Sequence, residues 1–346
     1  MSHEVETMAY ANEVPWHGLG TQVSDTMSPN EMLVAAGLDW TVSKRSAYTI
    51  DNPNTMCLTD PTSESNFIHV PDNHFIMRDT DNTVLSHCGP NYVPFQNAEV
   101  MDFFSKFTDA GNMKMETAGS LKNGQEIWGL AKLDSNFAIG DDRVGGYLLL
   151  NNSHKAGKAM TIMFTPIRVV CNNTLTLAMN IANSKERFRV CHVQMFDEEI
   201  KVAAEQALGL SGEAMTTFKQ QAEFLSSKRI KEHTLEQFIA DLCQPQLLAD
   251  RKAHLKTLGE DFTLPPLRDQ FNRKATQIRE AFENSPGAWM PSANGTWWGA
   301  LNAVTYVVDH QGSGNRQGAL NSAWFGTGAQ VKRKAMAKAL EYAEAA

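Results

Sequence analysis

The chain has 346 residues, a formal net charge of -8 and 42% hydrophobic residues. This much apolar material can build substantial cores, and the length favours two domains or one large one. The acidic balance excludes a chain that is a polycation as a whole. No apolar run approaches the roughly 20 residues that cross a bilayer. The first ten residues also lack the basic and apolar regions of a secretory signal. We therefore expect a cytoplasmic protein without a membrane partner.

Charge is distributed unevenly along the chain. Residues 1–140 hold 18 acidic and 7 basic side chains, whereas residues 141–346 hold 21 acidic and 24 basic ones. The most basic stretch, residues 141–190, has seven basic and three acidic residues. Three interpretations stay open: a polyanion that docks on one face, subunits that associate acidic face to basic face, and an ordinary solvated surface.

The five cysteines, at positions 57, 88, 171, 191 and 243, include no CxxC pair. An odd count with this spacing is typical of reduced thiols in a cytosolic protein. The pattern argues against a disulfide framework and against a zinc ribbon.

The first predicted element is a helix after an irregular start. Residues 8–20 show no helical or strand period and predict an extended arm or irregular turn. A helix follows Ser28, because Pro29 suits the first helical position and Glu31 completes a capping box.

Strands dominate the next part of the chain. Alternating or apolar runs predict strands at residues 40–50, 75–78, 83–87, 113–118, 126–133, 146–150, 159–164 and 187–193. Asn123 and Gly124 form a strong hairpin dipeptide. We expect a loop at residues 51–66, a polar turn at residues 151–158, and an end to the 159–164 strand at Pro166.

Helices dominate the rest. Helical periods predict helices at residues 97–110, from Arg168 onward, at 197–283, at 297–309 and at 329–345, with a linker-like loop at 284–296. Strands followed by helices favour an α+β fold. The N-terminal half should be rich in antiparallel sheet with packed helices, and the C-terminal half mostly helical. We predict a sheet-containing domain at 1–195 and a mainly helical region at 196–346.

Familiar catalytic motifs are absent from the sequence. It contains no GxxxxGK[ST] loop, no GxGxxG after a strand, no HExxH and no GxSxG. His74 and His87 would bind zinc if they faced each other across the predicted hairpin, and Asp141 with Asp142 would suit magnesium. Such residues are more often ordinary parts of hairpins and turns. We therefore assign no metal site and no cofactor.

Residues 165–175 carry polar groups inside an apolar run. Arg168 follows a proline, and Asn172 and Asn173 interrupt the apolar pattern. Buried amides need hydrogen-bond partners, so these residues either cap a helix or contact an anion beside Arg168. Both interpretations stay open.

Binding of nucleic acid needs basic groups interleaved with aromatic ones. Residues 155–189 fit this pattern in part, as do residues 228–231 and 332–338, although each cluster also suits a solvated surface. The predicted nucleic-acid-binding residues are Lys155, Lys158, Arg168, Lys185, Arg187 and Arg189.

Four motifs resemble those of a family of unknown function described as phage/plasmid-like proteins. They are PWHGLG at 15–20, GPNYVPFQN at 89–97, IRVVCNNTL at 167–175, and SAWFG at 322–326 followed by two lysines. The motif residues are Trp16, His17, Asn172, Asn173, Trp324 and Phe325. One departure is Asn172, where the family leads us to expect Gln. The resemblance implies carriage on a mobile element and residence in the host cytoplasm, and it assigns no reaction.

Three functions remain in view. The first is a non-enzymatic protein of DNA metabolism and recombination that binds or anneals single strands as a homo-oligomer. Its layout is similar, by fold-level analogy alone, to phage annealing proteins of the RecT and Erf type. The second is a protein–protein module that acts on a host defence or replication factor. The third is an enzyme with a site near Arg168, Asn172 and His17, so whether the protein is an enzyme stays open.

Overall fold

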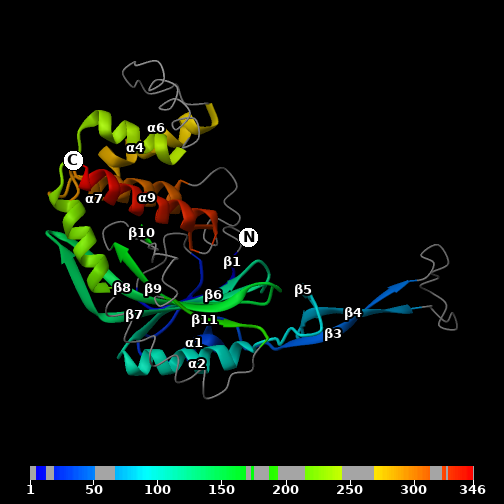
Figure 1. The fold of residues 1–346 in the computed structure, drawn as a ribbon. Helices are drawn as coiled ribbons and strands as arrows, with labels where there is room; N and C mark the ends of the chain where they lie inside the picture. Colours follow the sequence, from blue (N-terminus) through cyan, green and yellow to red (C-terminus); the bar gives the residue numbers. More distant parts are fainter. Residues whose placement is uncertain are drawn as a thin grey trace.

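The computed structural model describes residues 5–12, 19–50, 67–168, 173–174, 187–193, 215–243, 269–311, 322–324 and 326–345. Strands fill most of the first half and helices most of the second, so the predicted α+β class is confirmed (Figure 1). No described helix is both long enough and apolar enough to cross a membrane.

The body of the molecule contains one large sheet. Its strands are β1 (Val5–Tyr10), β2 (Thr21–Gln22), β6 (Lys114–Leu121), β7 (Glu126–Ile139), β8 (Asp142–Ser153), β9 (Ala159–Arg168), β10 (Asn173–Thr174) and β11 (Arg187–Cys191). The order is β10-β9-β8-β7-β6-β1-β2, and β11 also pairs with β9. Every pair is antiparallel except β1 with β2. The sheet is therefore a meander completed at one edge by the N-terminal strands.

The predicted hairpin between β6 and β7 is confirmed. Lys122, Asn123 and Gly124 all have positive φ, which asparagine and glycine adopt at little cost. The prediction of an irregular start is wrong for Met8 to Tyr10. These residues belong to β1, which lies between β6 and β2. Met8, Ala9 and Tyr10 are all buried although they alternate between the two faces, so this part of β1 shows no alternation of polar and apolar residues.

The expected end of β9 at Pro166 is also wrong. Pro166 pairs with Gly146 on β8, and the strand continues to Arg168. On its other side, β9 pairs with β11 as far as Met163 and with β10 from Ile167. Among the described residues, neither of these partners pairs with Pro166, so no ladder hydrogen bond from its nitrogen is required there. Residues 173–174 form β10 and not the helix that we expected to begin at Arg168.

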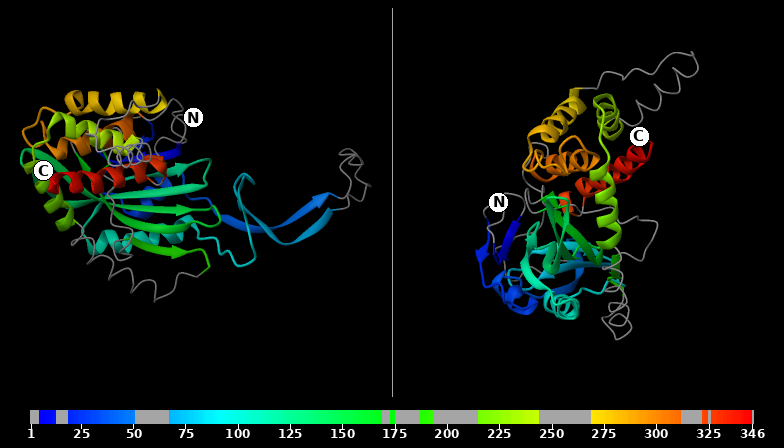
Figure 2. Two further views of the ribbon diagram at one scale, coloured as in Figure 1. Left: turned by 45° about the horizontal axis from the view of Figure 1, so that its top comes forward. Right: turned by 90° about the vertical axis from the view of Figure 1, so that its left-hand side faces the viewer.

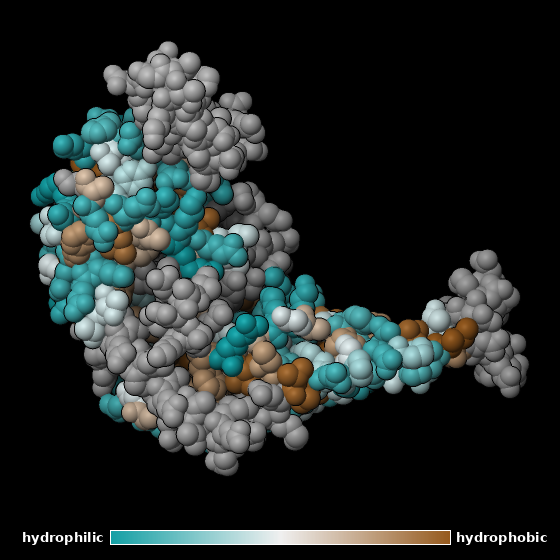
Figure 3. Space-filling view, in the orientation of Figure 1, coloured by the Kyte–Doolittle hydropathy of each residue, from teal (hydrophilic) through white to brown (hydrophobic). Residues whose placement is uncertain are grey.

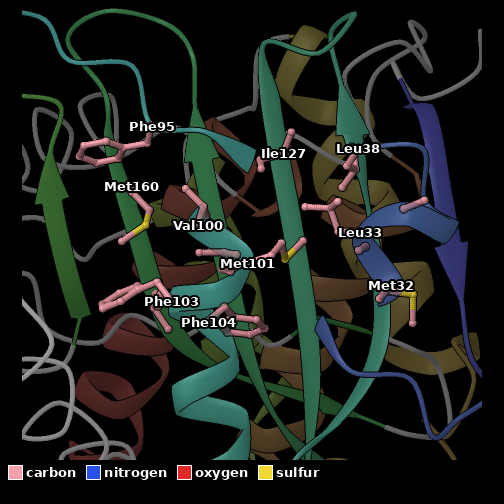
Figure 4. Packing of buried hydrophobic residues seen from close by; sticks show 14 of the residues in the cluster. Met32, Leu33, Leu38, Phe95, Val100, Met101, Phe103, Phe104, Ile127 and Met160 are labelled. Atoms are coloured by element: carbon pink, nitrogen blue, oxygen red, sulfur yellow. The ribbon is translucent and has the colours of Figure 1, made fainter. Parts of the chain in front are cut away.

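Two helices cover one face of the large sheet. They are α1 (Pro29–Ala35), with the predicted Ser28 capping box, and α2 (Asn97–Ala110), over the predicted residues. Phe103, Phe104 and Met101 of α2 are buried in a cluster with residues of β7, β8 and β9 (Figure 4). The apolar stripe of α2 therefore supplies much of the core on this face.

The helical half packs against the sheet through the β7–β8 turn. It contains helical residues 215–227 and α4 (Glu232–Cys243), α6 (Asp269–Asn284), α7 (Trp297–His310) and α9 (Thr327–Glu344). Figure 2 shows these helices stacked to one side of the sheet. Trp298 Nε1 donates to Asp142 Oδ2 at 2.8 Å, and the Ser292 amide donates to Asp141 Oδ1 at 3.2 Å. The two aspartates thus connect the halves, which is not the role considered for magnesium.

The expected linker at residues 284–296 is a packed series of turns. Ala293 and Thr296 are almost fully buried, and Thr296 caps α7 through its hydroxyl. Between α7 and α9, Lys332 Nζ donates to Asp309 Oδ1 at 2.8 Å, with both side chains buried. Lys338 pairs with Asp241 and Glu341. These lysines of the predicted 332–338 basic cluster therefore already have acidic partners.

A second, three-stranded sheet projects from the body. It consists of β3 (Val42–Ile50), β4 (Phe67–Arg78) and β5 (Val84–Cys88), in the order β3-β4-β5. β3 and β4, which we call the arm, extend well beyond the rest of the chain in both orientations (Figures 1 and 2). At the base, Arg78 lies over the Trp40 ring and pairs with Glu6 and Asp81. The expected loop at 51–66 lies outside the described residues.

Candidate functional site

One end of the large sheet gathers polar residues from distant parts of the chain. Here β8 turns into β9 through residues 154–158, and β7 begins at Glu126, opposite Ser153. The last residue of β11, Cys191, pairs with Ala159. The Val93 amide donates to the His192 carbonyl at 2.6 Å, so the segment before α2 meets the same end.

Four buried polar side chains at this end of the sheet, Glu126, Asn152, His154 and His192, make up what we call the floor. Glu126 pairs with Ser153 and Asn152 with Ile127, so these two side chains belong to opposite faces of the sheet. Each of the four is 3% exposed or less. Their atoms Glu126 Oε2, Asn152 Oδ1 and Nδ2, His154 Nδ1 and His192 Nε2 have no hydrogen-bond partner among the described residues. Buried polar groups are nearly always paired, so four such residues at one end of the sheet make it a candidate site. Single atoms of the same kind also occur elsewhere, on Thr165 and Trp297 among others.

His154 is held by its neighbours in one tautomer. Asn97 Nδ2 donates to the Leu38 carbonyl at 2.9 Å, so Asn97 Oδ1 accepts from His154 Nε2, also at 2.9 Å. The lone pair of Nδ1 therefore points away from Asn97. Burial, together with the smaller effect of the nearby His192, lowers the pKa of His154 to about 3. The imidazole is neutral at pH 7.

His192 is fixed by aromatic rings on both sides. The Tyr92 ring stacks on it at 4.9 Å and the Phe95 ring at 4.2 Å, between centroids. Nδ1 donates to the Val93 carbonyl at 3.1 Å, which leaves Nε2 as an acceptor. Burial lowers the pKa of His192 to about 4. The floor therefore presents two imidazole acceptors, a carboxylate oxygen and an amide.

Three basic side chains, which we call the rim, lie beside the floor: Lys155, Lys158 and Arg189. All three are exposed. Lys158 pairs with the buried Glu126, whereas Lys155 and Arg189 have no ion pair with a described carboxylate. Arg189 is opposite Thr161, three residues beyond Lys158, which places the two positions about 10 Å apart along the strands.

The other predicted basic residues are distributed differently. Arg168 ends β9, opposite Val144, whereas Lys158 precedes the start of that strand. Ten residues of strand separate them by about 30 Å. Arg187 begins β11 opposite Met163, and Lys185 lies outside the described residues. The structure thus brings Lys155, Lys158 and Arg189 to one end of the sheet and places Arg168 at the other.

Few of the predicted motif residues can be placed. Trp16, His17, Asn172 and Phe325 lie outside the described residues, and Asn173 forms part of β10. Trp324 packs edge-on against Trp128 at 6.0 Å, which attaches the SAWFG motif to the second face of the sheet. We interpret Trp324 as a packing residue.

The histidine pair considered for zinc is not formed. His74 pairs in register with Cys88, and His87 pairs with Phe75. His87 Nε2 instead lies 2.6 Å from Asn73 Oδ1. Within the described part of the chain, no three histidine, cysteine, aspartate or glutamate side chains come together as a metal site would require.

Comparison with protein families gives one match. The model of a domain of unknown function (DUF932) matches residues 84–339, which is more than half of the chain. The chain belongs to the DUF932 family. The DUF932 match includes the floor, the rim and the helices up to most of α9, and leaves β1 and the arm outside. Searches of curated proteins and of solved structures give no significant match.

Sequence reasoning missed the floor. His154 lies in the predicted polar turn at 151–158, where the prediction of a site concerned only the two lysines, Lys155 and Lys158. The GPNYVPFQN motif contains Tyr92, Phe95 and Asn97, which contact the two histidines. That motif was the available signal, since it supplies two contacts to His192 and one to His154. The pairing of β11 with β9, which brings His192 to the site, could not be inferred from it.

Proposed function

We propose that this DUF932 protein binds single-stranded nucleic acid in the DNA metabolism of a phage or plasmid, without catalysing a reaction. The observation that supports this most is the rim. Three exposed basic side chains, two in the β8–β9 turn and one on β11, belong to the same end of the sheet, and two of them have no described acidic partner. Such a surface attracts phosphates and releases the counterions around them.

The floor gives the rim its fixed geometry. Glu126 holds Lys158, and the stack of Tyr92 and Phe95 on His192 holds the end of the strand that carries Arg189. These two aromatic rings are buried against His192 and are not free to stack on bases. We therefore expect recognition through phosphates, with strong salt dependence and little base preference.

The mobile-element part of the proposal comes from the family resemblance. The PWHGLG, GPNYVPFQN, IRVVCNNTL and SAWFG motifs support carriage by a phage or plasmid and action in the host cytoplasm. The genes beside the coding sequence test this directly. Phage or plasmid replication and recombination genes would support it, and a bacterial housekeeping operon would contradict it.

The binding test compares two charge-matched double variants. Lys155→Gln/Arg189→Gln removes the two unpaired rim charges. Lys106→Gln/Lys219→Gln removes two exposed lysines from α2 and from the 215–227 helix. Affinity for a labelled oligothymidylate is measured by fluorescence anisotropy at several salt concentrations. We expect the rim variant to reduce the steepness of log K against log salt by about 1.4, or about 0.7 per lost contact. The control variant should keep the wild-type slope.

Two outcomes would contradict the proposal. One is the absence of oligonucleotide binding by the wild-type protein at low salt. The other is an equal loss of binding in both double variants, which would show that the rim contributes no more than other surface charges.

A further inference from the structure

Three of the four floor side chains lie on the face of the large sheet that α2 covers. Asn152 is opposite Ile127, which belongs to the core cluster on this face. His154 follows Asn152 by two residues and contacts Asn97 at the start of α2. His192 stacks on two aromatic residues of the segment before α2. Asn152, His154 and His192, which we call the inner floor, therefore lie between the sheet and the segment that leads into α2.

The inner-floor side chains are also close to one another. The Tyr92 ring stacks on His192, and the Tyr92 hydroxyl donates to the Ser153 carbonyl at 3.4 Å. Ser153 stands between Asn152 and His154 in the chain, so a single tyrosine spans the distance from His192 to both. His192 also contributes to the lowered pKa of His154, an effect that weakens with distance.

The unpaired atoms of the inner floor define the chemistry of what binds there. His154 Nδ1 and His192 Nε2 present lone pairs that need donors, and the Asn152 amide can both donate and accept. An ionised carboxylate or phosphate has no proton to give to two such acceptors. In the part of the chain that the structure describes, the side chains for a metal site do not come together. The occupant is therefore a neutral molecule with two protons to donate.

Burial limits the size of this occupant. Hydrophilic residues cover much of the helical half in Figure 3, where solvent pairs with their polar groups. The inner floor has no such access to solvent, since Asn152 and His154 are 0% exposed and His192 is 3% exposed. A molecule as large as a nucleobase could enter only by opening the core. A water molecule is small enough, and it can donate two hydrogen bonds and accept others.

We propose that the inner floor binds a water molecule as a permanent part of the fold. The water donates to His154 Nδ1 and His192 Nε2 and accepts from Asn152 Nδ2. Buried waters typically make about three hydrogen bonds to groups that the protein leaves unpaired, as this set of atoms supplies. The water connects the end of β8 to the end of β11. It thereby keeps the β8–β9 turn, with Lys155, aligned with the strand that carries Arg189.

A crystal structure of the full wild-type chain, at a resolution that shows ordered waters, tests the site directly. An electron-density peak should lie about 2.7 to 3.2 Å from both imidazole nitrogens. A peak about 2.0 to 2.1 Å from these nitrogens would instead be a metal ion. That result would overturn the inference, as would direct hydrogen bonds between the inner-floor side chains with no peak among them.

Magnetic relaxation dispersion of water oxygen-17, which counts long-lived waters, tests the site in solution. His192→Phe keeps a ring that can stack on Tyr92 and Phe95 but removes the acceptor nitrogen, so this variant should lose a long-lived water. His233→Phe, at an exposed position on α4, is the matched control and should keep the wild-type count. Equal counts in the wild type and a folded His192 variant would contradict the inference. The wild-type crystal structure decides the matter if that variant does not fold.

Neither measurement uses an oligonucleotide. The buried water and the binding of nucleic acid at the rim can therefore fail independently of each other.

Discussion

Two lysine–carboxylate pairs show how differently the two halves of the molecule use the same chemistry. In the helical half, the side chains of Lys332 and Asp309 are 1% and 6% exposed. At the end of the sheet, the carboxylate of Glu126 is 2% exposed but the side chain of Lys158 is 42% exposed. The first ammonium group has lost its water and depends on its partner. The second keeps access to solvent, so an anionic ligand can compete for it. Both lysines belong to basic clusters in the sequence. Burial gives Lys332 a packing role, whereas exposure leaves Lys158 able to bind a ligand.

The largest effect is expected at the fully buried pair. Lys332→Ala leaves the Asp309 carboxylate buried without its cation, which should lower the free energy of unfolding by about 3 to 5 kcal/mol. Urea unfolding followed by circular dichroism measures this loss. Lys332→Met/Asp309→Leu removes both charges and should recover most of the stability. A loss below about 1 kcal/mol in the single variant would show that the buried Lys332–Asp309 pair depends on its cation no more than a partly exposed pair does.

The floor histidines should make stability depend on pH. Their folded pKa values, about 3 for His154 and about 4 for His192, lie below the ordinary value of 6.5. As the pH falls, the unfolded chain therefore takes up protons first. The stabilisation is complete well above pH 6.5 and is lost progressively as the pH falls to about 4 for His192 and about 3 for His154. At pH 5.5 the loss should be about 1.4 kcal/mol for each histidine.

Urea unfolding between pH 7.5 and pH 5 measures this dependence. His192→Gln should remove about half of it, whereas His233→Gln, at an exposed position on α4, should leave it unchanged. Identical pH profiles for the His192 variant and the wild type would show that this histidine is not buried in its neutral form.

The smallest effect concerns the partly exposed pair. Glu126→Gln removes the charge that neutralises Lys158 while it keeps an oxygen acceptor in place. Affinity for oligothymidylate should rise by up to about fivefold, which corresponds to the energy of about 1 kcal/mol typical of a partly exposed ion pair. The salt dependence should also steepen by about 0.7, as for one added phosphate contact. Unchanged affinity and slope would show that Lys158 does not reach the ligand.

The parts of the fold that the sequence predicts are those with local causes. The Ser28 capping box, the Asn123–Gly124 turn and the apolar stripe of α2 each depend on residues close together in the chain, and all three are confirmed. β1 was missed because its residues Met8 to Tyr10 are buried on both faces and so lack the alternation by which strands are recognised. Its position between β6 and β2 depends on contacts more than a hundred residues away.

The site was predictable to a smaller degree. Lys155, Lys158 and Arg189 were identified by charge, but charge could not show that Arg168 lies at the other end of β9. The floor was missed for a related reason. His154 and His192 are 38 positions apart in the sequence. They become neighbours only through the register of β11 on β9, which no local pattern encodes.

Pro166 has a consequence for edge-to-edge pairing between the sheets of two molecules. In the described part of the chain, β11 and β10 leave Pro166 without a partner, so they cover the outer border of β9 in two short pieces, of five and two residues. On this described border, a strand from another molecule would therefore find no long, uninterrupted row of backbone N–H and C=O groups with which to pair. Short, interrupted sheet edges of this kind disfavour edge-to-edge aggregation.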